Sequence, residues 1–512
     1  MASLAFNALV QLVWRPYAMA RRLRAQGLRG PGYRFFAGSL GEIKRHLAEG
    51  AAVTLDAGDH DYIPMVQPHL RKWISLYGRT FVYWNGARPN VCLADVNLVK
   101  QVLFDRTGLY PKDYTNPHVT RLVGKGLLLT DGDDWKRHRM VVRPAFHMDK
   151  LKMMTATMSE CARSMMSEWE VQLAKDGGGV VEVELGKQFE ELAADVIART
   201  AFGSSYADGK RVFQAQREVQ FLAFSTLFDV QAPALRYLPT KKNLKTWKLD
   251  RQVRAMLMDI IEARLANSAA GGYGSDLLGL MLEAACAPPE HGEAAAPTLS
   301  MDEIIDECKT FFFAGHDTTS HTLTWAMFLL GTHPDWQEKL REEVRRECGG
   351  GDADAVPTGD ALSRLKLVNM FLLETLRLYA PVPMLQRNAS VDLELGGVVV
   401  PEGAMLSIPI ATIHRDKEVW GDDAGEFRPE RFENGAARAA KHPNALLLSF
   451  SCGPRSCIGQ NFAMLEAKEV IAMILQRFEL KISPKYVHAP MDVITIRPRH
   501  GLPMLIKRLN KV

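Results

Sequence analysis

One stretch of the chain constrains its fold more than any other: a helical apolar pattern that runs from Ser300 to about Gly331. Ser300 and Glu303 have the spacing of a capping box at its start, and Pro334 lies just beyond its end. Roughly thirty residues at about 1.5 Å each give a rod of about 45 Å. A helix of that length crosses an entire domain, so we expect it to lie at the centre of the fold.

Helical periodicity also dominates the rest of the sequence. It extends from about Asp131 to Leu265 and returns between Leu362 and Tyr379 and from Asn461 to Phe478. A hairpin signal surrounds Asn85-Gly86, and short β segments between Pro381 and Pro409 indicate a second sheet. Further short strands are expected at 480–482, 493–496 and 504–507. These patterns predict a mainly α fold with small β-sheets, of the α+β class.

The bulk properties of the 512 residues are those of a folded enzyme-sized chain. Hydrophobic residues make up 47% and charged residues 24%, which disfavours both disorder and a multi-span membrane protein. The net charge of +4 is too small to indicate a nucleic-acid partner. The 7 cysteines are scattered, without the paired spacing of a zinc site, and favour a reducing compartment.

The N-terminus carries an apolar run from Leu4 to Trp14, shorter than the roughly 20 residues that span a bilayer as a helix. Basic residues between Arg15 and Arg29 follow it, as expected when the downstream side stays cytosolic. A secretory signal peptide would carry its basic residues before the run. The segment 27–32, which contains Pro31, then interrupts the helix. We expect residues 1–32 to form a short membrane anchor and hinge and residues 33–512 the main domain; an amphipathic helix packed on the body is the alternative.

The segment FSCGPRSCIG, residues 450–459, matches the pattern FxxGxRxCxG. Five fixed positions rarely coincide by chance, and together they resemble the haem-binding loop of the cytochromes P450. The resemblance implies that Cys457 is the sulfur ligand of a haem iron, shielded by Phe450, and that Gly453 and Gly459 let the backbone pass close to the flat cofactor. Cys457 would precede a helix whose amide N–H groups and dipole stabilise a thiolate. A lone cysteine is otherwise more often a buried structural thiol.

The segment AGHDTT, residues 314–319, lies in the middle of the long helix and resembles the oxygen-activating motif of the same family. Gly315 costs roughly 1 kcal/mol of helix stability relative to alanine, and a groove for dioxygen would justify it. The resemblance implies that Asp317 and Thr318 form an acid–alcohol pair that relays protons to the oxygen being activated. The alternative is a helix kink in which Thr318 bonds back to its own helix.

A third motif concerns charge pairing. Glu374 and Arg377 fit the pattern ExxR, which places both charges on one helix face, although exposed pairs at this spacing are common and carry little weight alone. The segment FRPERF, residues 427–432, matches a second family motif. The resemblance implies that Arg431 joins Glu374 and Arg377 in a buried ion network that holds the cysteine loop.

Trp135 and Arg139 match the pattern WxxxR, one helical turn apart. The resemblance implies that both bind a haem propionate, and Arg387 and Arg455 fall where the family has further propionate contacts, since guanidinium groups pair well with carboxylates. By itself the pattern is more often an amphipathic surface helix. Neighbouring basic residues are candidates for a surface that meets an acidic reductase: Lys136, Arg137 and Arg143.

These matches follow the family order from Trp135 to Cys457, and the resemblance extends from about Gly27 to the C-terminus. It is strongest to the plant clan numbered seventy-two, and most of all to its seven-hundred-nine branch, in residues 14–40, 134–154 and 311–330. The resemblance implies the cytochrome P450 fold, with a long central oxygen-activating helix and a cysteine-ligand loop, as the catalytic domain over residues 33–512. The implied cofactor is haem b (iron protoporphyrin IX).

The same resemblance implies a monooxygenase that inserts one oxygen atom of O2 into a lipophilic substrate: a fatty acid, a terpenoid or an isoprenoid hormone. Electrons would come from NADPH through NADPH–cytochrome P450 reductase, with cytochrome b5 as a further candidate partner. The resemblance also implies attachment to membrane lipid of the endoplasmic reticulum, with the catalytic domain facing the cytosol.

Apolar residues at the expected pocket positions suit a lipophilic substrate. The expected lining is Phe312, Phe313, Ala314, Val382, Met384, Leu385 and Ile494. In-chain fatty-acid hydroxylation is the first hypothesis, and oxidation of a plant hormone (gibberellin, cytokinin or brassinosteroid) is the second. A P450-fold hydroperoxide isomerase or dehydratase would need no dioxygen-activating pair, so Asp317 and Thr318 argue against it. A haem sensor without turnover stays open.

Overall fold

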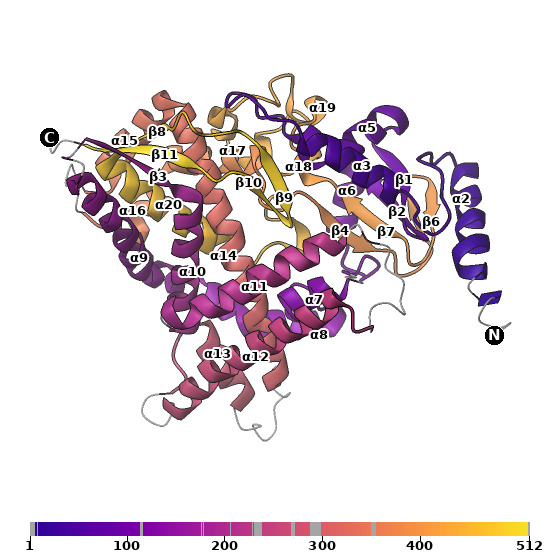
Figure 1. Ribbon diagram of the computed structural model, residues 1–512, viewed down its shortest axis with the longest axis horizontal. Helices are drawn as coiled ribbons and strands as arrows, with labels where there is room; N and C mark the ends of the chain where they lie inside the picture. Colours follow the sequence, from indigo (N-terminus) through magenta and orange to yellow (C-terminus); the bar gives the residue numbers. More distant parts are fainter. Residues whose placement is uncertain are drawn as a thin grey trace.

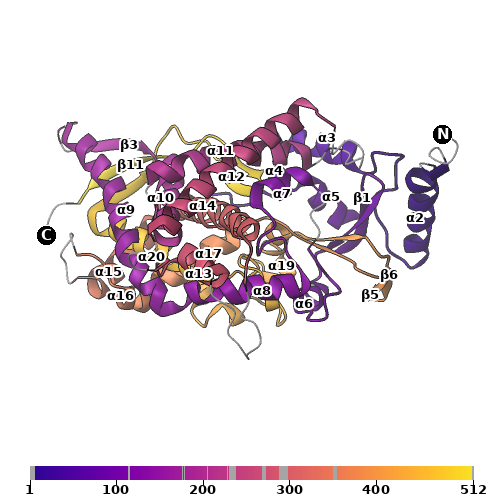
Figure 2. The same ribbon diagram turned by 90° about the horizontal axis from the view of Figure 1, so that it is seen from below.

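The long helix forms the axis of the computed structural model as α14 (Met301–Thr332), with Ser300 as N-cap and the expected capping box to Glu303. Figure 1 and Figure 2 both show α14 passing through the middle of the molecule with other helices on either side. The predicted central helix is therefore confirmed. The structure describes residues 6, 7, 9–112, 116–175, 177, 179–204, 206–227, 229, 238–267, 272–286, 298–349 and 355–509.

Helices make up most of the molecule. Beside α14, the longest are α9 (Met148–Lys175), α10 (Leu185–Phe202), α11 (Tyr206–Leu227), α12 (Lys241–Asn267) and α20 (Gln460–Arg477). Those of intermediate length are α2 (Arg15–Ala25), α3 (Leu40–Ala51), α5 (Pro68–Tyr77), α6 (Val96–Leu103), α7 (Pro117–Val123), α8 (Gly132–Val142), α13 (Leu277–Cys286), α15 (Pro334–Glu347), α16 (Gly359–Arg364) and α17 (Lys366–Leu378). Short turns are η1 (Val10–Trp14), α4 (Ile63–Val66), η2 (Arg143–Phe146), α18 (Ile410–Ile413), α19 (Lys417–Trp420), η5 (Pro429–Phe432), η6 (Ala436–Arg438) and η7 (Gly453–Arg455).

The single helix predicted between Leu362 and Tyr379 is wrong in one respect: the chain forms two helices there, α16 and α17. The carboxylate of Glu343, on α15, accepts hydrogen bonds at 2.8–2.9 Å from the first three amide N–H groups of α17. These are orphan donors that a helix end must satisfy, so a residue outside the segment sets where α17 begins.

The predicted hairpin at Asn85-Gly86 is confirmed as β1 (Thr80–Asn85) and β2 (Arg88–Leu93). The separate second sheet is only partly correct, because β7 (Met405–Ile408) pairs parallel with β2 and gives a four-stranded sheet of order β1-β2-β7-β4. The outer strand is β4 (Leu385–Asn388). In two further sheets, β5 (Leu393–Leu395) pairs with β6 (Val398–Val400), and β11 (Pro503–Arg508) lies between β3 (Val180–Glu184) and β8 (Phe478–Ile482).

The strand expected at 493–496 is instead a tight hairpin, with β9 (Pro490–Val493) and β10 (Thr495–Pro498) pairing antiparallel. Ile494 alone forms its tip, with φ of 72°. A β-branched residue in the left-handed region is a strained conformation that persists only where its surroundings impose it.

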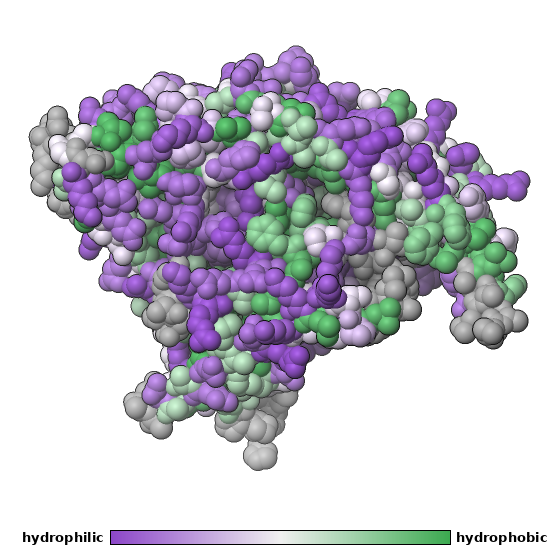
Figure 3. Space-filling view, viewed as in Figure 1, coloured by the Kyte–Doolittle hydropathy of each residue, from purple (hydrophilic) through white to green (hydrophobic). Residues whose placement is uncertain are grey.

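The N-terminal helix α2 lies at one end of the molecule beside β6, as Figure 1 shows. Leu23 is fully buried, whereas Trp14 and Tyr17 are 67% and 50% exposed. Figure 3 shows apolar side chains gathered at this end. Of the predicted anchor, residues 1–5 and 8 lie outside the described residues. Among the residues that are described, no helix has both the length and the apolar character needed to cross a membrane.

Candidate functional site

The cysteine loop, residues 448–459, leads directly into α20. The amide of Cys457 donates to the Phe450 carbonyl (2.8 Å), which closes the loop, and Gly459 is the N-cap of the helix. Gly453 has φ of +71°, and a Cβ there would lie 2.2 Å from the Leu103 carbonyl oxygen, so only glycine fits against α6. At Gly459 the closest atom to an added Cβ would be 3.9 Å away. Gly459 is therefore less tightly packed than Gly453.

The Cys457 side chain has accessible surface, yet protein surrounds it closely enough that burial raises the pKa of its thiol. The amide N–H groups of Gly459 and Gln460 oppose this rise, as expected at a helix N-terminus, and so do two nearby cations. Together these groups do not cancel the rise in the thiol pKa. The sulfur is thus accessible although protein surrounds it closely, and a positive charge at its accessible surface would stabilise a thiolate.

The middle of α14 also borders interior space. Ala314, Gly315, His316 and Thr318 are partly accessible although the residues before and after them are buried. Burial still lowers the pKa of His316 to about 4, which indicates an enclosed surface. The AGHDTT segment thus carries accessible surface that protein encloses.

Two details of this segment differ from expectation. A Cβ on Gly315 would lie 2.8 Å from Ile197 Cδ1, so the glycine permits close packing against α10, and an oxygen groove is not needed to explain it. The Thr318 hydroxyl donates to the Ala314 carbonyl (2.7 Å), which is the backbone-bonded alternative.

The Asp317 carboxylate has partners other than the Thr318 hydroxyl. Its carboxylate accepts hydrogen bonds from Thr495 Oγ1 (2.5 Å), Gln220 Nε2 (3.0 Å) and Arg497 Nη2 (3.1 Å). These donors come from the β9–β10 hairpin and from α11. Burial acts to raise the pKa of Asp317, but His321, Arg497 and these bonds together lower it.

A line of charges connects Asp317 to the surface. Arg497 Nη1 lies 3.9 Å from Glu190 Oε1 on α10, and Glu190 pairs in turn with Arg217 on α11. Arg217 is about half exposed, whereas Arg497 and Asp317 are buried. The acid at the centre of the molecule is therefore linked to solvent through alternating charges.

Trp135 and Arg139, on α8, lie beside the cysteine loop. Arg139 Nη1 donates to the Ser456 carbonyl (3.3 Å). The guanidinium groups of Arg139 and Arg455 lie 5.4 and 4.4 Å from the Trp135 ring centre, and each makes a cation–π contact with the ring. Arg455 also pairs with Asp131.

Lys112 was missed by sequence reasoning and completes this cationic cluster. Burial and the neighbouring charges of Arg387 and Arg455 lower its pKa to about 7, and Asp131 offsets them only in part. An anion bound among these side chains would relieve their repulsion. Because Lys112 lies in a stretch without a recognisable motif, no sequence signal identified it.

Of the expected pocket residues, five are partly accessible and two, Phe312 and Phe313, are buried. Ala314, Val382, Leu385, Met384 and Ile494 are partly accessible. Met384 packs toward the cluster around Trp73, outside the α14 core.

Phe312 does not line a hollow, since it is fully buried, stacked on Phe202 at 4.1 Å and packed edge-on against Phe213. Phe313 is buried in the same core. The 3.6-residue period turns Phe312 toward α10 and α11 and away from the accessible surface of Ala314.

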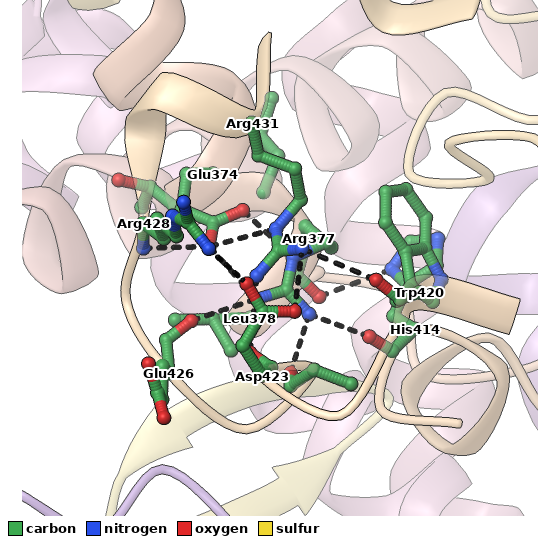
Figure 4. A network of polar contacts seen from close by, with 12 residues as sticks. Glu374, Arg377, Leu378, His414, Trp420, Asp423, Glu426, Arg428 and Arg431 are labelled. Atoms are coloured by element: carbon green, nitrogen blue, oxygen red, sulfur yellow. Dashed lines mark hydrogen bonds and ion pairs between the residues drawn. The ribbon is translucent and has the colours of Figure 1, made fainter. Parts of the chain in front are cut away.

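The predicted ion network is present and deeply buried (Figure 4). Glu374 and Arg377 are fully buried and form two hydrogen bonds of 2.7 and 2.8 Å, and Arg431 Nε lies 3.7 Å from Glu374 Oε1. Arg377 also donates to the backbone carbonyls of His414, Ala424 and Glu426 (2.7–3.0 Å). The network therefore fixes the backbone between α18 and η5.

Of the three basic residues next to WxxxR, two are exposed and could meet a partner protein. Arg137 is committed to a bidentate pair with Glu303 on α14. Lys136 is exposed and pairs with Asp133 at the surface, and Arg143 is exposed.

Comparison with known proteins agrees with this geometry. The sequence model of the family described as Cytochrome P450 matches residues 63–501. Cytochrome P450 709B1 of Arabidopsis thaliana is 45% identical over 509 residues, which cover 99% of this chain and 96% of that protein. Cytochrome P450 CYP72A616 of Paris polyphylla is 42% identical over 498 residues (97% and 95%), and cytochrome P450 734A6 of Oryza sativa subsp. japonica is 40% identical over 511 residues (98% and 94%).

The chain therefore belongs to the cytochrome P450 family and is a haem monooxygenase, an oxidoreductase. The names of its relatives match the predicted clan and branch. The predicted α+β class and fold are likewise confirmed.

Proposed function

We propose that Cys457 is the protein ligand of haem iron and that the chain uses this haem to insert one oxygen atom from O2 into a lipophilic substrate. The observation that carries the proposal is the environment of the sulfur: desolvated, accessible, backed by amide donors, and close to a partly buried cluster of cations. Among the described residues, no group of three or more His, Cys, Asp or Glu side chains could hold a metal without such a cofactor.

Several side chains would hold the haem. The propionates would bind among Arg139, Arg387, Arg455 and Lys112. Bound carboxylates would offset the repulsion between these neighbouring cations. Trp135 would hold two of these guanidinium groups in place and Phe450 would shield the sulfur. Gly459, which has no side chain, would let the flat ring lie close to the backbone.

When bound, the haem supplies O2 binding and O–O cleavage, which electron donation from a thiolate favours. Thr318 would hold a proton at its hydroxyl on the interior surface, once that hydroxyl turns from the Ala314 carbonyl. Asp317 would deliver protons to this point, which requires it to release at least one of its three donors. Glu190, between Arg497 and the half-exposed Arg217, would be the titratable group on the path from solvent.

The substrate surface is apolar where it is accessible, at Ala314, Val382, Leu385 and Ile494. In-chain hydroxylation of a fatty acid is the first assignment, and oxidation of a plant hormone is the second. We propose NADPH–cytochrome P450 reductase as the electron donor, with Lys136 and Arg143 on its docking surface. Cytochrome b5 is a further candidate.

We also propose that residues 1–32 attach residues 33–512 to the endoplasmic reticulum membrane, with the catalytic domain in the cytosol. The exposed aromatic side chains of Trp14 and Tyr17, next to arginines, suit a membrane interface.

The test uses microsomes that contain the chain and the reductase. They are incubated with fatty acids and, separately, with hormone precursors, and products that gain one oxygen are sought by mass spectrometry. NADPH-dependent products identify the substrate class. Conversion of a hydroperoxide without NADPH or O2 would instead indicate an isomerase and overturn the proposal.

A further inference from the structure

The last turn of α17, the helix that carries Glu374 and Arg377, ends in carbonyl groups that the helix itself cannot satisfy. Side chains from elsewhere bind them. Ser449 Oγ donates to the Leu376 carbonyl (2.7 Å), His414 Nδ1 lies 3.1 Å from the Arg377 carbonyl, and Arg415 donates to the Leu378 carbonyl. Ser449 belongs to the cysteine loop, so the loop is attached directly to this helix end.

His414 makes a second attachment. Its Nε2 accepts a hydrogen bond from the Leu448 amide (2.9 Å), while its own carbonyl accepts one from Arg377 (2.7 Å). A carbonyl can only accept and an amide N–H can only donate, so the hydrogen of the ring is on Nδ1 and Nε2 carries the lone pair. His414 is fully buried, and burial together with the charges of Arg377 and Arg415 lowers its pKa to about 3. The ring is neutral in a single tautomer.

From Leu448 the bonds continue to the sulfur. The Leu448 carbonyl accepts from the Ser451 amide, and the Phe450 carbonyl accepts from the Cys457 amide, both at 2.8 Å. Ser451 has φ of 56°, a left-handed conformation that places it at the bend of the loop. A continuous series of bonds thus runs from the Glu374–Arg377 pair through His414 to Cys457.

We propose that His414 is a positioning residue for the iron ligand: it fixes the start of the cysteine loop to the end of α17 and so holds Cys457 in place. The inference rests on the proposed role of Cys457. Removing the imidazole leaves the Leu448 amide without its buried acceptor and the Arg377 carbonyl without its donor. The loop then moves to recover these bonds, and the sulfur leaves the ligand position.

The test compares the reduced, CO-bound spectra of the full-length wild type and of His414→Ala, His414→Gln and His69→Ala, together with haem content and Tm. His69 is the matched control, since it is another buried imidazole with a pKa of about 3, packed on Trp73 in a cluster without cysteine-loop residues. Spectra are recorded well below the Tm of each variant.

For His414→Ala we expect a shift of at least about tenfold in the ratio of thiolate-ligated to thiolate-displaced haem, since one lost buried hydrogen bond gives about that shift and the imidazole makes two. His414→Gln, whose Oε1 can accept from the Leu448 amide, restores most of the ratio, and His69→Ala keeps it whatever its Tm. If His414→Ala takes up no haem, recovery in His414→Gln supports the proposal, and failure of both overturns it.

An unchanged ratio in His414→Ala, or an equal loss in His69→Ala, would also overturn the proposal. A wild type that itself lacks the thiolate spectrum would refute the role of Cys457 instead, so the two failures are distinct.

Discussion

The two walls of the proposed haem site are held in different ways. The cysteine loop is fixed mainly to backbone groups, through bonds to the end of α17 and a fully buried ion network. Asp317, on the oxygen side, is held only by side chains, and these come from α11 and the β9–β10 hairpin. The cysteine loop is thus fixed by several independent bonds. The contacts of Asp317 come from two elements, and a movement of either α11 or the hairpin would break some of them. We infer that the fold holds the sulfur still and lets the acid move.

The strongest test of this contrast is Arg377→Ala. It leaves the Glu374 carboxylate buried without its partner, which typically costs about 3–5 kcal/mol, and it frees three backbone carbonyls. We expect almost no haem-loaded protein, measured as haem per polypeptide and as Tm. Arg428→Ala is the control, because Arg428 is exposed and pairs with Asp423 at the surface. Equal haem content in both variants would contradict the claim that the buried ion network holds the cysteine loop.

Asp317→Asn probes the other wall. The variant keeps hydrogen-bonding groups in the same place but cannot carry protons, so we expect substrate oxidation to fall about a hundredfold, within the usual range for acid–base catalysis. The CO spectrum should stay that of the wild type, because Asp317 does not support the cysteine loop. Turnover at the wild-type rate, or loss of the spectrum, would contradict the assignment.

Thr318→Ala should have a smaller effect of a different kind. We expect product formation to fall about tenfold while NADPH consumption continues and hydrogen peroxide is released, because oxygen is still activated without an ordered proton. Product, NADPH and peroxide are measured together. Thr318→Ser retains the hydroxyl and should stay coupled; a fully coupled alanine variant would argue against any role of the hydroxyl.

The smallest effect is expected at Glu469, on the helix that follows Cys457. Burial raises its pKa to about 8, against a hydrogen bond of 2.5 Å from Ser159. The folded chain therefore keeps a proton that the unfolded chain releases, and stability falls as pH rises from about 4.5 to about 8.

Glu469→Gln should remove this loss, with a Tm near that of the wild type at pH 5 and roughly 2–4 °C higher at pH 8. Glu433→Gln, at an exposed position, is the control. A constant difference between variant and wild type at both pH values would show that Glu469 does not titrate in this range.

The sequence predicted the ligand side well because its parts are local. Cys457 and its glycines fall within ten residues, Glu374 and Arg377 lie on one helical turn, and the capping box of α14 is a four-residue pattern. Such spacings are set by backbone geometry, so they are visible without a structure.

The oxygen side was predicted less well because its contacts are distant in sequence. Gln220 and Thr495 are 97 and 178 positions from Asp317, and neither lies in a recognisable motif. Phe312 was expected in the pocket, but the helical period turns it into the core against Phe202. The break between α16 and α17 depends on Glu343, which only the tertiary fold brings there.

The most direct test of the proposed site is the reduced, CO-bound spectrum of the purified wild type beside that of Cys457→Ser. We expect the wild type to show the Soret band of thiolate-ligated ferrous-CO haem and the serine variant to lose it, since serine cannot supply the sulfur. A wild type without this band, or a serine variant that keeps it, would contradict the assignment of Cys457 as the iron ligand.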